Sequence, residues 1–351
     1  MLLGDQIYAD AMADLFDARE LDERYRDRYR RAFGRVDESK GFNAHKLFSH
    51  VPTYFALDDH EIINDWDGDL TKDWDGSGRR KNREMYTIAR REAWNYQMHH
   101  SAVGNSKKEN FWYDFGSAGF QNFVLDTRTQ RRKGIPRNDL SALIGIHNPG
   151  DGIINPQWKD FTSWLDAAKD DIKAGKPIII ASGSPIGPIP QEWSRFPGLV
   201  RFADNLLGYP GFLVGLHKLF IEMKAINVIW LSGDPHFSCV TDVEIEYDGD
   251  IVKIVHVVAS GLFAPLPFTN DRLDRYVWDK WTTLDYGGFG GGVGNLRVRT
   301  FPTLLTNEAS HFVRLDLSED RTGGAYRLDV AAYGTENQLL AGLQKPLIKW
   351  V

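Results

Sequence analysis

The sequence predicts an α/β protein in which helices cover a layered sheet, and two patterns of apolar residues indicate this. Several short apolar runs end directly in clusters of polar residues, as strands do when ligand-binding side chains follow their carboxyl ends. Other segments repeat apolar residues every three or four positions, which is the spacing of a helix that packs one face inward. The hydrophobic fraction of 42% in 351 residues is typical of a globular protein that buries a core.

Six segments are predicted to be strands. Some are short apolar runs before polar clusters, and others are nearly continuous β-branched runs, which is the pattern of strands covered on both faces. The first kind comprises residues 1–3, 51–57, 120–125 and 226–231, and the second comprises residues 177–181 and 251–259.

Three segments are predicted to be helices, at residues 21–33, 80–99 and 157–174. The first has apolar residues at intervals of four, with Arg, Asp and Glu between them, as a surface helix does. These apolar residues are Leu21, Tyr25, Tyr29 and Phe33. The third segment stops at Gly175, with Pro177 just beyond, which is a common helix end.

The pattern changes after about residue 300. Apolar and polar residues alternate in two segments, 311–317 and 326–333, on either side of the turn-forming Gly323-Gly324. This pattern predicts a terminal β-hairpin followed by a tail. No linker or repeat divides the chain, so we expect residues 1–351 to form a single domain. Because the apolar residues 1–3 have no preceding element to pair with, we expect the chain to begin inside that domain, truncated at its N-terminal side.

Charge and composition exclude some classes of partner. The formal net charge of −6 argues against a structural nucleic-acid partner, which needs a broad basic surface. No signal peptide and no run of membrane-spanning length is present, so a soluble protein is expected. The single Cys239 suits a reducing compartment and equally an exported protein without disulfides. The compartment stays open, with the cytoplasm slightly favoured, and the oligomeric state is not predicted.

Two acidic clusters follow the first two predicted strands. Asp5 ends one apolar run, and Tyr8 lies three residues further on, so one turn of chain could bring a carboxylate and a phenol to one ion. Asp58-Asp59-His60-Glu61 ends the second run, and three acids placed so closely repel one another unless positive charge lies among them. Taken singly, a carboxylate after a strand is more often a helix cap or turn former.

Two further clusters carry candidate site residues. In Ser232-Gly233-Asp234-Pro235-His236, Asp234 and His236 lie on one side of an extended segment, two residues apart. Oxygen and imidazole donors gathered at the ends of one sheet argue for a binuclear or multinuclear hydrolytic metal site. Arg128, in Asp126-Thr127-Arg128, could bind two oxygens of a phosphate, and a structural Asp–Arg pair is the alternative.

At these residues the sequence resembles the PhoD-like alkaline phosphatase and phosphodiesterase family of the calcineurin-like metallophosphoesterases. The stretch from Gly4 to Tyr8 is similar to the GDxxY segment of that family, residues 58–61 to its DDHE signature, and residues 232–236 to its SGDxH segment. The similarity runs in order from Gly4 to about Gly261. It departs in two ways: a further strand with a metal ligand, which precedes GDxxY in the family, is absent, and Ser182 and Ser184 stand where many relatives have a histidine.

The resemblance implies a fold and a site. The fold is a four-layer α/β/β/α sandwich of two mixed sheets. The metal ligands are Asp5, which bridges two ions, Tyr8, Asp59, Asp234 and His236, and family precedent suggests iron with calcium, although other divalent metals would fit. His60 is implied to lie near the leaving group.

The expected activity is metal-dependent hydrolysis of small phosphate mono- or diesters by a metal-bridging hydroxide. Two alternatives remain. A catalytically impaired relative could keep the fold and act as a binding or structural module, which the missing upstream ligand favours. A metal-independent hydrolase could use Ser184 as nucleophile, although the sequence lacks a Gly-x-Ser-x-Gly elbow and an obvious partner histidine.

Overall fold

A mixed eight-stranded sheet runs through the protein in the order β3-β4-β5-β6-β8-β7-β10-β9. A computed structural model gives this fold and describes residues 1–9, 20–34, 44–70, 82–100, 110–145, 155–192, 205–225, 227–235, 237–260, 276–284, 294–306, 311–320, 325–334 and 336–347. The strands are β3 (Tyr113–Ser117), β4 (Phe120–Leu125), β5 (Ile178–Ser182), β6 (Val228–Ser232), β7 (Ser238–Tyr247), β8 (Asp250–Ala259), β9 (Thr282–Thr283) and β10 (Arg297–Thr306).

The centre of this sheet is parallel, because β4, β5, β6 and β8 pair in the same direction. Strands β3, β7, β10 and β9 extend it with antiparallel pairs. The four central strands correspond to four of the apolar runs predicted from the sequence. Because both faces of a parallel sheet are covered, these strands need apolar residues at consecutive positions, and all five residues of β6 are buried.

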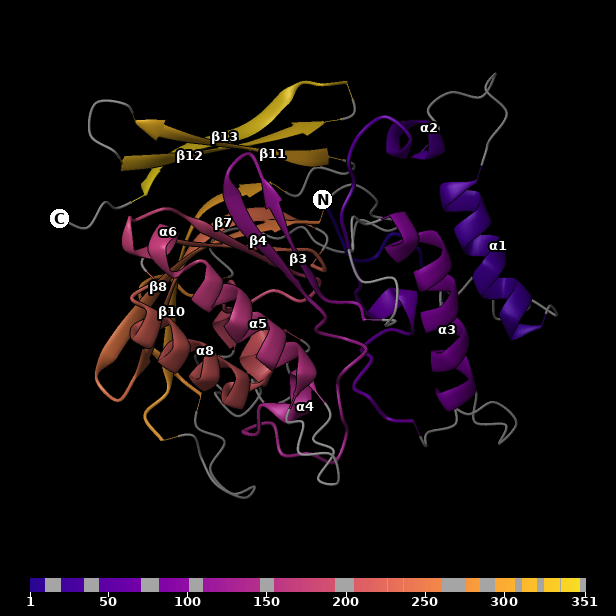
Figure 1. The fold of residues 1–351 in the computed structure, drawn as a ribbon, viewed down its shortest axis with the longest axis horizontal. Coiled ribbons are helices and arrows are strands. Elements are labelled where there is room, and N and C mark those ends of the chain that lie inside the picture. The colour runs from indigo at the N-terminus through magenta and orange to yellow at the C-terminus, as the bar shows by residue number, and fades with distance from the viewer. Residues whose placement is uncertain are drawn as a thin grey trace.

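One face of the sheet is covered by helices (Figure 1). These are α4 (Ser141–Ile144), α5 (Pro156–Ala167), α6 (Lys169–Lys173) and α8 (Pro210–Met223), with the short 3-10 helix η6 (Leu206–Gly208). Phe123, Ile180 and Trp230 of the sheet share an apolar cluster with Phe161 and Phe212 of the helices. The sequence predicted one helix over 157–174, and the structure divides it at Ala168, where ψ changes to 2°.

The opposite face carries the N-terminal part of the chain. Strands β1 (Leu2–Leu3) and β2 (Phe55–Ala56) pair in parallel, and helices α1 (Leu21–Phe33) and α3 (Asn82–Tyr96) pack with them in a second apolar cluster. The short elements α2 (Ala44–Phe48), η3 (Asp59–Glu61) and η4 (Met98–His100) belong to the same region. Tyr29 stacks on Tyr96 at a ring distance of 5.2 Å, which fixes α1 on α3. Strand β2 is shorter than predicted, since β1 offers it two pairing residues.

A three-stranded antiparallel sheet completes this face, formed by β11 (His311–Asp320), β12 (Ala325–Gly334) and β13 (Leu339–Leu347). Leu328 and Val330 of β12 join the second apolar cluster. The sequence predicted two of these strands, and its turn at Gly323-Gly324 lies outside the described residues. The third strand was missed because Gly342 and Pro346 interrupt its pattern. Proline is tolerated in an edge strand, where its missing N–H is not needed for pairing.

These contacts confirm the predicted α/β sandwich. Helices α4, α5, α6 and α8 lie on one side of the large sheet, and the β11–β13 sheet lies on the other (Figure 1). The β1–β2 pair, α1 and α3 share the apolar cluster of that second side. The second β layer therefore consists of two separate small sheets in the described part of the chain, where the sequence predicted one mixed sheet.

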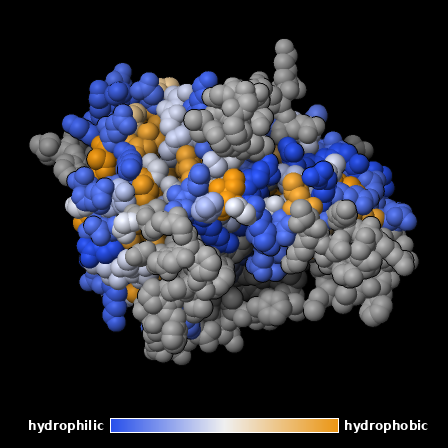
Figure 2. Space-filling model, turned by 90° about the horizontal axis from the view of Figure 1, so that it is seen from below, coloured by the Kyte–Doolittle hydropathy of each residue, from blue (hydrophilic) through white to orange (hydrophobic). Residues whose placement is uncertain are grey.

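Apolar residues are scattered over the visible surface. On the described part of the face in Figure 2, hydrophobic residues form small patches among hydrophilic ones. Within the described ranges, every helix is too short or too polar to cross a membrane.

Candidate metal centre

Three segments bring carboxylates together where strands end. Asp5 follows β1, Asp58 and Asp59 follow β2, and Asp234 follows β6. Asp5 and Asp234 have positive φ angles, of 56° and 80°, so both turns use the left-handed region, which aspartate tolerates better than most residues. Gly4 allows the first two turns to meet, because a side chain there would overlap the Cβ atom of Asp58.

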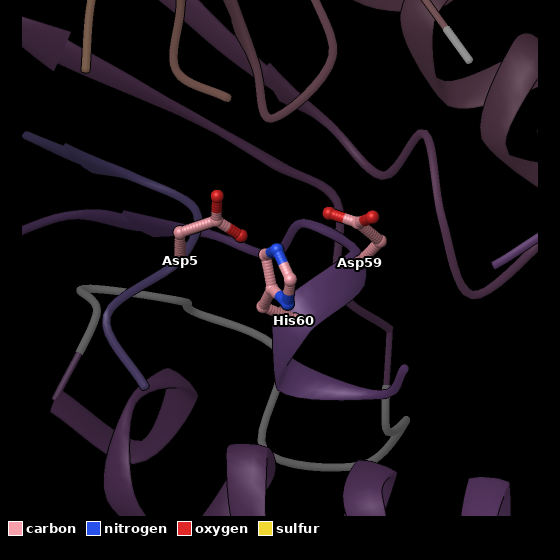
Figure 3. A group of neighbouring side chains, drawn as sticks. All are labelled: Asp5, Asp59 and His60. Atoms are coloured by element: carbon pink, nitrogen blue, oxygen red, sulfur yellow. The ribbon is translucent and has the colours of Figure 1, made fainter. Parts of the chain in front are cut away.

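The side chains form two overlapping groups that could hold metal ions. The first group is Asp5, Asp59 and His60, and the second is Asp5, Asp58, Asp59 and Asp234. In each group the contributing ligand atoms lie within 4.8 Å of one another. Figure 3 shows the side chains of Asp5, Asp59 and His60 facing a common space. Asp5 and Asp59 belong to both groups, which suits two neighbouring ions that share ligands.

The state of Asp5 fits a cation. The residue is 8% exposed, and neither carboxylate oxygen has a hydrogen-bond partner among the described residues. Burial raises the pKa of Asp5 well above its usual range, and the charges of Asp59, Asp58, Glu61 and Asp234 raise it further. A buried carboxylate without hydrogen bonds is costly unless positive charge compensates it. The oxygen-rich donor set therefore suits a hard or borderline metal ion.

Arg128 supplies a fixed positive charge behind the carboxylates. Its Nε donates to Oδ1 of Asp58 in an ion pair whose two side chains are both fully buried. Its Nη2 lies 3.6 Å from Oδ1 of Asp59. The sequence assigned Arg128 to a phosphate oxygen or to a structural pair with an aspartate, and the structure places it in a pair with Asp58.

Ser184, the alternative nucleophile, is fully buried beneath the site. Its Oγ lies 3.1 Å from Oγ1 of Thr127, accepts from Arg131 at 3.0 Å and lies 3.4 Å from Oδ1 of Asp58. These described contacts contain no histidine that could remove its proton. The arrangement favours a structural role for Ser184 over nucleophilic attack.

Tyr8 and His60 form the outer side of the cluster. Their ring centroids lie 4.3 Å apart with the planes inclined at 39°. Burial raises the pKa of the Tyr8 phenol, and the neighbouring carboxylates, Asp5 first among them, raise it further. The phenol would thus ionise only beside strong positive charge. His236, the remaining predicted ligand, lies outside the described residues.

Sequence reasoning brought Asp5, Tyr8, Asp59, His60 and Asp234 into one candidate site, and the structure places them together. It did not assign Asp58 as a ligand, although Asp58 belongs to the second group. The signal was present in the sequence, because Asp58 directly precedes Asp59, but neighbouring residues in an extended chain usually point in opposite directions. The turn into η3 after Asp58 changes that relationship.

The fold and the carboxylate cluster define an α/β protein with a candidate metal centre at the junction of its two β layers. A family model described as "PhoD-like phosphatase" matches residues 1–272. The match covers most of the sequence, and the chain therefore belongs to the PhoD-like phosphatase family.

Two solved structures are similar to this chain. "Structure of PhoD" aligns with a TM-score of 0.56 and 14% identity over 98% of this chain and 62% of that chain, which shows a shared fold. This chain thus spans less than two thirds of that structure's length. "GAP50 the anchor in the inner membrane complex of Plasmodium" aligns with a TM-score of 0.37 and 12% identity, over 93% of this chain and 73% of that one. Comparison with curated proteins gives no match.

Proposed function

We propose that the protein hydrolyses small phosphate mono- or diesters with the help of two or more bound metal ions. The observation that carries the proposal is Asp5, a buried carboxylate whose oxygens have no hydrogen-bond partner among the described residues. It lies in a group with three further carboxylates. Bound cations would stabilise such a group by offsetting the repulsion between its negative charges. Family membership indicates phosphate esters as the substrate class.

The proposed ligands are those of the sequence analysis with one addition. Asp5, Tyr8, Asp59, Asp234 and His236 would hold the ions, and the geometry supports adding Asp58. Iron with calcium is the proposed metal pair, and other divalent ions are compatible with the same donors. Metal ions bound there would lower the pKa of a water molecule and stabilise negative charge on the phosphoryl group.

Two further residues act on the substrate or on the ligands. His60 would protonate the leaving oxygen, since its imidazole lies at the edge of the carboxylate group, in contact with Tyr8. Arg128 would balance the charges of Asp58 and Asp59, because its buried guanidinium lies against both. We therefore propose that Arg128 supports the metal ligands, in place of the phosphate contact expected from the sequence.

The test combines metal analysis with turnover. The metal content of the purified protein would be measured, together with hydrolysis of an aryl phosphate monoester and an aryl phosphodiester before and after chelation. We expect tightly bound metal and turnover that chelation abolishes and added metal restores. Asp5→Asn should lose both metal and turnover, whereas Asp316→Asn, at an exposed ion pair on β11, should change neither.

The possible outcomes separate the alternatives. Bound metal without hydrolysis of either ester would instead support a binding or structural module. Hydrolysis that survives chelation, in protein shown to be free of metal, would contradict the proposal and reopen a metal-independent mechanism.

A further inference from the structure

Glu61 lies directly behind the candidate metal centre and is fully buried. Its Oε2 accepts from the backbone N–H of Asp5 at 3.0 Å and from that of Asp58 at 2.9 Å. Its Oε1 accepts from the backbone N–H of Gln6 at 2.6 Å and from the side chain of Gln97 at 3.2 Å. One carboxylate thus joins two turns that are more than fifty positions apart in the sequence.

The four hydrogen bonds define what Glu61 can do. A carboxylate offers about four lone-pair positions, and four N–H donors occupy them here. Glu61 accordingly belongs to neither group of potential ligands, despite its place beside Asp59 and His60 in the chain. Its role is to bind the backbone that carries the ligands.

The turns that Glu61 joins have little other regular pairing. Strands β1 and β2 pair through two residues each, and Asp5 then enters the left-handed region with a φ of 56°. Consecutive N–H groups of such a turn point to one side and bind an anion well. Glu61 provides this anion for Asp5 and Gln6, and it reaches Asp58 with the same carboxylate.

Gln97 orients the Glu61 carboxylate from the far side. Its side-chain amide donates to Oε1 of Glu61 at 3.2 Å and to Oε1 of Gln6 at 2.8 Å. Gln97 is also fully buried. Together these contacts hold the Glu61 carboxylate against the two turns that carry Asp5 and Asp58.

We propose that Glu61 is a positioning residue that holds Asp5 and Asp58 at metal-binding distance and so sets the affinity of the centre for metal. This inference rests on the proposed function, since it concerns the same centre. Residues that orient metal ligands through hydrogen bonds typically change metal affinity by about tenfold to a hundredfold when they are replaced. Glu61 acts on two ligands at once.

The test replaces Glu61 with Gln, which keeps the size of the side chain but turns one acceptor oxygen into a donor facing backbone N–H groups. Metal-free protein would be titrated with Ca²⁺ and, without oxygen, with Fe²⁺ by calorimetry. We expect Glu61→Gln to weaken binding by about tenfold or more. The matched control is Glu92→Gln, at a buried glutamate of α3 that pairs with Arg26 and Arg91, and its affinity should stay within about twofold of wild type.

The outcomes are distinct. Unchanged affinity in folded Glu61→Gln, with a wild type that binds metal, would overturn the inference alone, whereas a wild type that binds no metal would overturn the proposed function as well. If Glu61→Gln does not fold, Gln97→Met is the second variant, since it removes the donor that orients the Glu61 carboxylate toward the backbone N–H groups of Asp5 and Asp58. Severalfold weaker binding would support the inference, and wild-type affinity would refute it.

Discussion

The phenol ring of Tyr8 packs against the imidazole ring of His60, with 4.3 Å between the ring centroids. A backbone hydrogen bond from Ala9 to the carbonyl of His60, 3.1 Å long, lies beside this contact. The turn after β1 therefore holds both the backbone and the ring of His60. A residue fixed in this way can present one nitrogen to a reacting oxygen without a change of rotamer.

Replacing His60 with Ala should lower turnover by about a hundredfold to ten-thousandfold, the usual contribution of a general acid. Metal content should fall much less than turnover, because the carboxylates of both groups remain. Steady-state hydrolysis and elemental analysis of the same sample would measure the two quantities. His50→Ala, at an exposed position, is the control. Loss of metal with unchanged turnover per bound metal would assign His60 to ligation instead.

Replacing Arg128 with Met should lower the free energy of unfolding by about 3–5 kcal/mol, because Asp58 would keep a buried charge without its partner. Urea unfolding of the metal-free protein would measure the change. Arg327→Met, which breaks an ion pair with Asp329 whose arginine is 53% exposed, should cost less than about 1 kcal/mol. Equal effects of the two substitutions would show that burial of the Arg128 pair contributes nothing.

The His256 side chain makes stability depend on pH. Burial lowers the pKa of His256 to about 3, and its Nε2 lies 2.8 Å from Oγ of Ser232. In the unfolded chain this residue takes up a proton near pH 6.5, so the unfolded state binds more protons between pH 6.5 and 3. The stability that neutral His256 provides is thus present above pH 6.5 and is lost as the pH falls.

Replacing His256 with Gln should remove this dependence. Below about pH 6.5 the wild type should lose stability relative to the variant by about 1.4 kcal/mol for each pH unit. Urea unfolding at several pH values between about 7 and about 4 would measure the difference between the two proteins. Parallel pH profiles of wild type and variant would contradict the buried, neutral state of His256.

Gly233 is predicted to be intolerant of a side chain. A Cβ atom there would overlap the carbonyl oxygen of Leu3 in β1. Gly233→Ala should therefore displace β1 together with Asp5. The free energy of unfolding should fall by about 1–3 kcal/mol, as for other overpacked sites, which lowers the melting temperature. The metal affinity should fall as well, because Asp5 moves. Gly116→Ala on β3 is the matched control, because a Cβ atom at Gly116 would meet no neighbouring atom within 4 Å. Normal metal binding by Gly233→Ala would show that β1 can move without loss of the site.

Much of the fold could be predicted from the sequence because it depends on local patterns. The parallel strands are continuous apolar runs, and α1 has its buried residues at intervals of four. The division between α5 and α6 was missed, because alanine, which stands at the boundary position 168, does not usually break a helix. The single-domain organisation and the compartment stay predictions.

Several residues of the candidate site could be predicted from the sequence, but Asp58 and the contacts between the residues could not. Acidic clusters after strands marked Asp5, Asp59 and Asp234 as candidates. The partner of Arg128 could not be found in the same way, because Asp58 lies 70 positions away and the pattern offered Asp126 nearby. Asp126 instead accepts from the backbone of Arg128 and Thr129. The metal identities and the role of His236 remain predictions.

The glycines at the ends of β5 and β6 have a consequence for folding. Gly183 and Gly233 let the carbonyl groups of Leu57 and Leu3 rest directly on the large sheet. Asp234 therefore joins Asp5, Asp58 and Asp59 only after the N-terminal segment docks on a sheet built from much later parts of the chain, and such distant contacts form slowly. A cation that binds the completed cluster would favour the docked state by mass action. The metal concentration during synthesis would then influence what fraction of the protein folds completely, in addition to any effect on turnover.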